Sequence, residues 1–246
     1  MQRGFDAAGG FSFRAEPAMP ELARNPLRDF FESRREGRGI WKWVHYFDIY
    51  DRHFSRFRGQ KVHVVEIGIY SGGSLDMWRE YFGPQSRIYG VDIEQGCAAY
   101  DGGSVQVFIG DQADRDFWRR FRSQVPRVDV VIDDGGHLPE QQIVTLEELL
   151  PHLHPGGVYL CEDVHGSFNG MAAYVQGLSH QLNDITNIIG DESNPERRLV
   201  CGTNSFQSAI DSIHLYPYVT VIERTRSLVP ELVAPKHGTV WEPFLT

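Results

Sequence analysis

The sequence predicts a doubly wound α/β fold: a mostly parallel, Rossmann-like sheet covered by helices on both faces, with an antiparallel C-terminal edge. Five short runs have the near-continuous hydrophobicity of strands that are buried on both faces: "KVHVVEIGI", "SRIYGVDI", "VQVFIGD", "VDVVIDD" and "GGVYLCED". Segments with helical periodicity separate these runs, which is typical of βαβ units. The later stretch "SIHLYPYVTVIER" indicates two short strands around Pro217, or one interrupted strand, and so predicts the antiparallel edge.

Length, composition and charge narrow the class of protein. The 246 residues suit one sizeable domain, and no apolar stretch approaches the roughly 18 residues of a membrane span. The start "MQRGFDAAGG" lacks the apolar core of a signal peptide, and the spacing of Cys97, Cys161 and Cys201 matches neither a disulfide framework nor a zinc site. We therefore expect a cytoplasmic protein with no membrane partner. The net charge of -9 disfavours nucleic acid as a partner and favours a small molecule.

The domain organisation follows from changes in pattern along the chain. Residues 1–35 are predicted to form an N-terminal arm that is mobile or is ordered by a partner subunit, because their beginning mixes Gly, Ala, Pro and charges without a period. Residues 36–246 are predicted to form a single domain. Within it, residues 166–208 carry the polar segment "GDESNPERR" and are expected to be a lid or a variable insertion.

An aromatic helix is predicted before the first strand. The segment from Trp41 to Phe54 has apolar side chains at intervals of four, three and four residues, the spacing of one helical face: Trp43, Phe47, Tyr50 and Phe54. We interpret this stripe as core packing of an amphipathic helix. Together with the loose arm, the helix favours a homo-oligomer.

Every one of the five predicted parallel strands ends in acid. In open α/β sheets, ligands bind beyond the carboxyl ends of the strands. A single acid there is more often a helix cap, but five strands that end alike indicate a ligand with positive charge, hydroxyl groups or both, because like charges near one another are costly without such partners. The acids are Glu66, Asp92, Asp111, Asp133 with Asp134, and Glu162 with Asp163.

The glycine-rich turn "EIGIYSGGSL" after the first strand narrows the ligand further. A dinucleotide fingerprint that starts at Gly68 would have Tyr70 at its second glycine position, where the side chain would block the approach of a pyrophosphate. This disfavours an NAD enzyme. The remaining pattern of Glu66, Asp92 and Asp111 suits a nucleoside that carries a cationic chain and no phosphate.

The paired acids at the ends of the fourth and fifth strands indicate a metal site. Asp134, Glu162 and Asp163 would converge as hard oxygen ligands, which Mg²⁺, Ca²⁺ or Mn²⁺ prefer, and Mg²⁺ is the first choice. The alternative is that these acids only cap helices or lie on the surface. His137 follows Asp134 by three residues at the start of the next helix, so we predict that it is a catalytic base beside the metal.

Taken in order, the motifs resemble those of the class I S-adenosylmethionine-dependent methyltransferases. They are similar in particular to the metal-dependent sugar O-methyltransferases of antibiotic biosynthesis, of the macrolide and rhamnosyl type. The resemblance covers about residues 40 to 165 and rests on "HYFDIYDRHF", "VVEIGIYSGGSLDMW", "IYGVDIE", "FIGDQAD", "VIDDGGH" and "LCEDVH". It departs from that pattern where Lys42-Trp43 replaces a frequent Lys-Gly, and at the second glycine of "DDGGH", which is commonly Ser.

The resemblance implies S-adenosylmethionine as the cofactor. It implies that Glu66, Gly68 and Ser74 lie along the methionine part, and we place Tyr70 of the same turn among the cofactor contacts. It further implies that Asp92 binds the ribose hydroxyls, that Asp111 lies near the adenine, and that Asp133 lies near the ammonium group. The metal is implied at Asp134, Glu162 and Asp163, and Lys42, His45 and Tyr46 are implied to close over the cofactor.

The expected reaction is methyl transfer to a hydroxyl of a small molecule, which the resemblance implies is a sugar of a natural product or a nucleotide sugar. The metal would hold two oxygens of a diol while His137 removes a proton and the oxygen attacks the methyl group in line. His165 is a second candidate for contact with the acceptor. Two alternatives stay open: a non-catalytic protein that binds S-adenosylmethionine, and a metal-dependent hydrolase.

Overall fold

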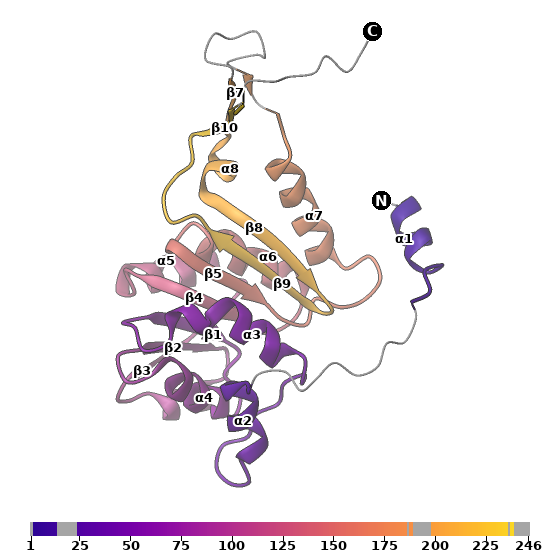
Figure 1. Ribbon diagram of the computed structural model, residues 1–246. Coiled ribbons are helices and arrows are strands. Elements are labelled where there is room, and N and C mark those ends of the chain that lie inside the picture. Colours follow the sequence, from indigo (N-terminus) through magenta and orange to yellow (C-terminus); the bar gives the residue numbers. More distant parts are fainter. Residues whose placement is uncertain (1, 14–23, 186, 189–197, 236, 239–246) are drawn as a thin grey trace, which may run out of the picture.

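A seven-stranded sheet forms the centre of the protein (Figure 1). The structure is a computed structural model that describes residues 2–13, 24–185, 187–188, 198–235 and 237–238. The strand order is β3-β2-β1-β4-β5-β9-β8, and β1 to β5 are mutually parallel. The strands are β1 (His63–Ile67), β2 (Arg87–Asp92), β3 (Val105–Ile109), β4 (Val128–Asp133), β5 (Leu153–Cys161), β8 (Ile210–Tyr216) and β9 (Val219–Arg224).

The antiparallel edge is confirmed as two strands rather than one. β9 pairs antiparallel with both β5 and β8, and Pro217 lies in the turn between β8 and β9. Proline has no amide hydrogen to contribute to a ladder, so the chain turns where the sequence pattern is interrupted. The predicted fold class is therefore confirmed.

Helices cover both faces of the sheet and create two cores. Val64 and Val130 pack on one face with the first set of helices, whereas their neighbours Val65 and Val131 pack on the other, because successive strand residues point to opposite sides. The first set is α2 (Pro26–Ser33), α3 (Tyr46–Phe54) and α4 (Gly73–Phe82). The second set is α5 (Arg115–Gln124), α6 (Pro139–Leu149) and α7 (Gly170–Leu182). Within the described residues, no helix has the length and hydropathy needed to cross a membrane.

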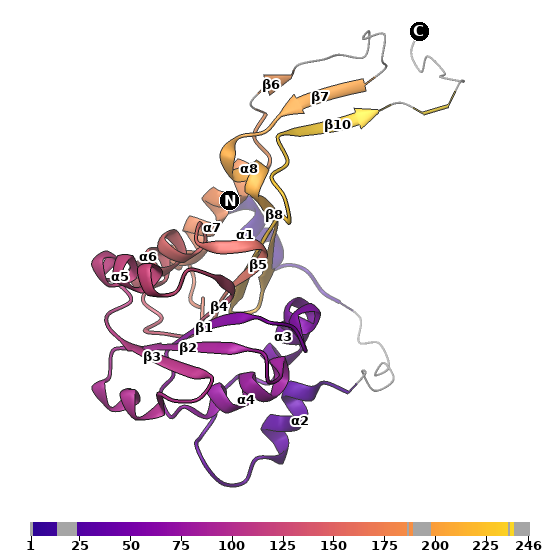
Figure 2. The same cartoon turned by 90° about the vertical axis from the view of Figure 1, so that its left-hand side faces the viewer.

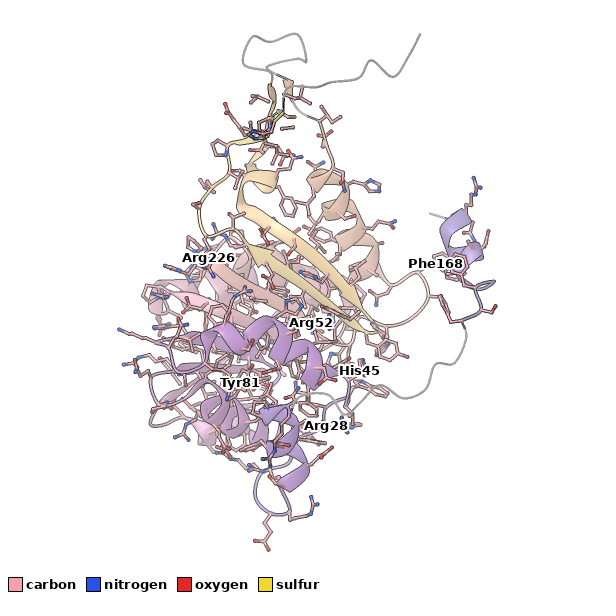
Figure 3. All side chains as sticks on the ribbon, viewed as in Figure 1. Arg28, His45, Arg52, Tyr81, Phe168 and Arg226 are labelled. Carbon is pink, nitrogen blue, oxygen red and sulfur yellow. The ribbon has the colours of Figure 1, made fainter. Side chains whose placement is uncertain are left out.

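The N-terminal segment differs from the predicted arm. Helix α1 (Gln2–Ala8) has no buried residue. It meets the domain where Phe5 stacks on Phe168, the residue that Figure 3 labels, with ring centroids 5.3 Å apart. Helix α2 instead belongs to the packed domain, because Leu27 is fully buried. Asn25 caps this helix and Pro26 occupies its first turn, so the chain is ordered well before residue 36. Residues 14–23 of the expected arm lie outside the described residues.

Residues 166–208 also differ from the expected lid. Helix α7 packs on the sheet, with Met171 and Val175 buried, and leads away from the strand ends that carry the acids. Beyond it, a small three-stranded sheet projects from the domain (Figure 2): β6 (Asn187–Ile188), β7 (Arg198–Gly202) and β10 (Glu231–Pro235). Helix α8 (Ser205–Ala209) then leads back into β8. The polar segment 189–197 lies outside the described residues.

The aromatic helix is shorter than predicted. Helix α3 begins at Tyr46, and Phe47, Tyr50 and Phe54 are buried as expected. Trp43 precedes the helix and is 53% exposed, so its assignment to the core stripe was wrong. The physical reason is that residues 41–45 form a loop that directs Lys42 inward, which turns both neighbouring tryptophans toward the surface.

The packing of α2 against the core can be tested by measuring the free energy of unfolding of variants. Leu27→Ala is expected to lower the free energy of unfolding by about 2–5 kcal/mol, because it leaves a cavity under a fully buried side chain. Phe13→Ala serves as the control, since Phe13 is 87% exposed and its truncation is expected to change stability by less than about 0.5 kcal/mol. Urea denaturation measures both values, and equal small effects would contradict the packed position of α2.

Candidate active site

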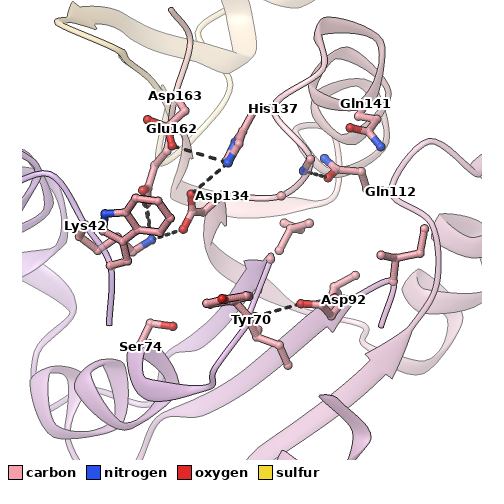
Figure 4. Close-up of a pocket in the computed structure, with 18 of the residues that line it drawn as sticks. Lys42, Tyr70, Ser74, Asp92, Gln112, Asp134, His137, Gln141, Glu162 and Asp163 are labelled. Carbon is pink, nitrogen blue, oxygen red and sulfur yellow. Dashed lines mark hydrogen bonds and ion pairs between the residues drawn. The ribbon is translucent and has the colours of Figure 1, made fainter. Parts of the chain in front are cut away.

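A cavity of about 730 Å³ opens at the carboxyl ends of the parallel strands (Figure 4). Its size suits a cofactor or drug-sized ligand. It lies where the strand order reverses between β1 and β4, the position at which open α/β sheets bind ligands. Nine of the predicted cofactor, metal and catalytic residues line it: Gly68, Tyr70, Ser74, Asp92, Asp111, Asp134, His137, Glu162 and Asp163. Lys42, Tyr46 and His165, which the sequence analysis also named, line it as well.

The glycine turn after β1 shapes the floor of the cavity. Gly68 has a φ of 81°, and a Cβ atom there would lie 1.9 Å from the carbonyl oxygen of Asp134. Only glycine allows this close approach of the β1 turn to the end of β4. The amide of Tyr70 donates to Asp92 Oδ2 at 3.0 Å, and the amide of Glu94 donates to Asp92 Oδ1 at 2.9 Å. Asp92 is thus held by the backbone at the rim.

Two predicted cofactor contacts do not line the cavity. Glu66 is fully buried, where it accepts hydrogen bonds from Ser74 Oγ at 2.8 Å and Trp78 Nε1 at 3.0 Å, and burial raises its pKa. Asp133 is also fully buried and accepts from Tyr159 and Gln112, while burial raises its pKa to about 7. The structure therefore places both carboxyl groups behind the cavity wall, where they support the turns that form it.

Lys42 lies at the centre of the acids. Its Nζ is 2.6 Å from Asp134 Oδ2, 3.0 Å from Glu162 Oε1 and 3.8 Å from Glu66 Oε1 (Figure 4). Burial by itself lowers the pKa of Lys42, but the charges of Asp134, Glu162 and Glu66 outweigh burial and hold the pKa above its usual value. Lys42 is therefore a buried cation that links the ends of β1, β4 and β5.

Helix α3 fixes the acids at the end of β5. Tyr50 donates to Glu162 Oε1 at 2.6 Å, and Tyr46, one helical turn earlier, donates to Asp163 Oδ1 at 2.7 Å. The indole of Trp43 also donates to Asp163 Oδ1, at 3.1 Å. Both oxygens of Glu162 face Lys42, at 3.0 and 3.1 Å. Burial and the nearby charge of Asp134 raise the pKa of Glu162.

His137 faces the two acids that line the same corner. Its Nε2 is 3.6 Å from Asp163 Oδ2 and 4.0 Å from Asp134 Oδ1, while its Nδ1 is buried without a hydrogen-bond partner among the described residues. Both His137 and Asp163 have positive φ angles, of 56° and 53°. Such angles are uncommon for non-glycine residues and are concentrated at functional sites.

The geometry fits a hard divalent cation. Asp134, His137 and Asp163 each offer one ligand atom, and these atoms all lie within 4.8 Å of one another. Asp134 and Asp163 turn one oxygen each toward this point, which suits the oxygen preference of Mg²⁺. Glu162, the third predicted ligand, is instead bridged to Asp134 by Lys42. Lys42 balances only part of the negative charge, so the corner favours a further cation.

Gln112 is a site residue that the sequence analysis missed. Its Nε2 donates to Asp133 Oδ1 at 3.1 Å, and its Oε1 accepts from the amide of Gly136 at 2.7 Å. It lines the cavity beside Asp111 and so supports the "DDGGH" turn from the end of β3. The sequence signal that could have identified Gln112 is its position directly after the strand-end acid Asp111.

Comparisons with known proteins define the class. Residues 65–164 match the sequence family described as a methyltransferase domain. The MycE methyltransferase of the mycinamicin pathway, solved in complex with Mg and SAH, superposes with a TM-score of 0.63 at 29% identity, over 82% of this chain and 54% of that one. The protein therefore has a class I methyltransferase fold, and the resemblance drawn from the sequence is confirmed.

The particular relatives are sugar O-methyltransferases of antibiotic pathways. Mycinamicin VI 2''-O-methyltransferase of Micromonospora griseorubida is 31% identical over 75% of this chain and 49% of the relative. L-olivosyl-oleandolide 3-O-methyltransferase of Streptomyces antibioticus is 37% identical over 92% of this chain and 59% of the relative. The chain thus spans about half the length of the curated relatives it matches.

Because Lys42 pairs with buried acids, we expect that replacing its charged side chain greatly lowers the stability of the protein. Lys42→Met is expected to lower the free energy of unfolding by about 3–5 kcal/mol in the absence of divalent ions, because Asp134 and Glu162 lose their buried partner. Lys61→Met is the matched control, since Lys61 is exposed. Denaturant unfolding in EDTA measures both variants, and an unchanged Lys42→Met protein would contradict the linking role of this side chain.

Proposed function

We propose that the protein is an S-adenosylmethionine-dependent O-methyltransferase that uses a divalent metal ion. The observation that carries the proposal is the strand-end cavity, in which a glycine turn and Asp92 lie beside a corner formed by Asp134, His137 and Asp163. The MycE structure contains Mg and SAH, and its similarity to this chain supports the same pair of ligands here.

The cofactor would lie along the β1 turn and the end of β2. Gly68 and Ser74 would flank its methionine part, with Tyr70 in the same turn. Asp92 would accept from the ribose hydroxyls, and Asp111 and Gln112 would lie near the base. Glu66 and Asp133 would act from behind the wall, by holding Ser74 and Gln112 in place.

The metal ion would be held by Asp134, Glu162 and Asp163. Two of these carboxylates already present an oxygen to the open corner, whereas Glu162 would exchange part of its contact with Lys42 for the ion. When bound, S-adenosylmethionine supplies an electrophilic methyl group, and the ion supplies Lewis-acid polarisation of the acceptor oxygens.

The chain's own residues then handle the proton. His137 would take the proton of the acceptor hydroxyl on Nε2, the nitrogen that faces the cavity corner. Asp163 lies 3.6 Å from this nitrogen and would stabilise the imidazolium that forms. Asp163 is itself fixed by Tyr46 and Trp43, so the base and its partner are positioned before the acceptor arrives.

The acceptor would be an uncharged sugar hydroxyl on a natural product. Among the described lining residues Lys42 is the cation, and it is already paired with acids, so the cavity offers little to a nucleotide diphosphate. Trp41 and Trp43 supply exposed aromatic surface at the rim that suits an apolar aglycone. The names of the relatives, which act on mycinamicin VI and rhamnosyl tetracenomycin C, support this class of acceptor.

Cofactor binding is tested at Asp92. Asp92→Asn is expected to weaken binding of S-adenosylhomocysteine about tenfold to a hundredfold, because it removes the charged carboxylate that would accept hydrogen bonds from the ribose hydroxyl groups. Glu94→Gln, an exposed change two residues further on, is the control and should leave affinity unaltered. Isothermal titration calorimetry gives both constants. Full affinity in Asp92→Asn, or no binding by the native chain, would exclude the proposed cofactor site and favour the hydrolase alternative.

Catalysis is tested at His137. His137→Gln is expected to lower kcat about 10²–10⁴-fold while S-adenosylhomocysteine affinity is retained, because the change removes the base and leaves the cofactor contacts. Transfer of a labelled methyl group to mycinamicin VI or to rhamnosyl tetracenomycin C measures turnover. Near-normal turnover by the variant would exclude His137 as the base. Tight cofactor binding without transfer to any sugar hydroxyl would favour a non-catalytic binding protein.

Metal dependence is tested by removal of the ion. Treatment with EDTA is expected to abolish methyl transfer, and Mg²⁺ in excess should restore it, because Asp134 and Asp163 present oxygen ligands suited to this ion. Asp163→Asn should raise the Mg²⁺ concentration needed for half-maximal activity at least tenfold. Activity that persists in EDTA would contradict the metal's role.

A further inference from the structure

A second group of metal-ligating side chains lies outside the cavity. His53 on α3, His214 on β8 and Glu223 on β9 each offer one ligand atom, and these atoms all lie within 4.8 Å of one another. His53 Nδ1 is 2.5 Å from Glu223 Oε1, and the rings of His53 and His214 have centroids 4.7 Å apart. None of the three lines the cavity at the strand ends.

The other polar atom of each side chain is held by a neighbour. Tyr216 lies 2.9 Å from His53 Nε2, Ser212 lies 2.9 Å from His214 Nε2, and Arg56 donates to Glu223 Oε2 at 2.9 Å. This leaves Nδ1 of His214 without a hydrogen bond among the described residues. Metal-binding histidines and carboxylates are typically oriented in this way, by partners on the atom that does not bind the ion.

We infer that His53, His214 and Glu223 form a second metal site, for a transition metal of the Zn²⁺ class. Two imidazoles and one carboxylate are a ligand set that zinc uses, and they differ from the oxygen-rich corner at Asp134 and Asp163. With three protein ligands, the fourth position of a tetrahedral ion is open to water. The residues come from three elements, and His53 is almost completely buried, so the site is enclosed by the fold rather than formed by chance on a flexible surface.

Binding requires a rearrangement of protons that the neighbours allow. With an ion bound, neutral His53 would carry its proton on Nε2 and donate a hydrogen bond to the hydroxyl oxygen of Tyr216, so that Nδ1 is free to bind the ion. The other charged groups near the cluster are Arg56 and Arg52, which carry positive charge, and Asp211, which carries negative charge; Figure 3 labels Arg52.

An ion at this site would join α3 to the edge hairpin of the sheet. The first two turns of α3 carry Tyr46 and Tyr50, which hold the acids at the end of β5. The turn of the hairpin carries Tyr218, whose ring lies 5.7 Å from those of Trp43 and His165 at the cavity rim. The site would therefore brace two elements that border the cavity. The inference is independent of the proposed methyl transfer.

Titration of the full chain with Zn²⁺ tests the inference. The His137→Gln variant removes the imidazole from the other cluster, so zinc that still binds to it reports the second site. We expect this variant to bind about one equivalent of Zn²⁺, and Co²⁺ in its place to give the visible absorption of imidazole ligation. The double variant His137→Gln/His214→Gln is expected to bind zinc at least tenfold more weakly, with an unchanged circular dichroism spectrum.

Ser212→Ala in the His137→Gln background separates a metal site from an ordinary hydrogen-bond network. It leaves all three ligands in place and removes only the group that orients His214, so zinc affinity should fall while the stoichiometry stays at one. The inference is overturned if zinc binding disappears in His137→Gln, or if it is equal in His137→Gln and His137→Gln/His214→Gln. In either case His53, His214 and Glu223 form only a hydrogen-bonded brace.

Discussion

The buried contact between Lys42 and the acids at the ends of β4 and β5 is the interaction on which the rest of the site depends. Parallel strands bring their carboxyl ends to one edge of the sheet, so Asp134 and Glu162 would repel each other without a partner. Lys42 reaches them from the loop before α3 and lies 2.6 Å from the first and 3.0 Å from the second. One side chain thereby connects the helical layer to the edge of the sheet that carries the acids.

This connection explains why α3 is more than core packing. Its buried face inserts Phe47 and Phe54 into the first core, while Tyr46 and Tyr50 of the same helix point their hydroxyl groups at Asp163 and Glu162. The apolar packing that anchors the helix therefore also fixes the positions of the two carboxylates. A site held in this way is preorganised, because its acids and His137 need no large movement before a cation or an acceptor binds.

Much of this arrangement could be predicted from the sequence. The apolar runs with acidic ends identify the parallel strands and the edge where a ligand binds, since strand direction alone brings Asp92, Asp134 and Asp163 to one side. The positions of Glu66 and Asp133 were harder to predict, because residues near a strand end alternate between the cavity and the layer behind it. A shift of one residue, as between Asp133 and Asp134, decides which acid reaches the ligand.

Other features depend on contacts between distant parts of the chain. Lys42 is separated from Glu162 by 120 residues, and its local pattern, between two tryptophans, predicted a helix rather than an inward-turning loop. The clearest signal was chemical: a group of acids needs a cation, and the chain has three lysines. The cluster of His53, His214 and Glu223 was likewise hidden, because it forms only when the antiparallel edge packs beside α3.

The most direct test of the central claim is a crystal structure of the full chain with S-adenosylhomocysteine and Mn²⁺, in which anomalous scattering locates the metal. The account predicts one Mn²⁺ in the cavity, bound by carboxylate oxygens of Asp134, Glu162 and Asp163, with the cofactor's ribose on Asp92 in the same cavity. A cavity that holds neither ligand, or a metal bound away from these acids while Lys42 keeps all its contacts, would contradict it.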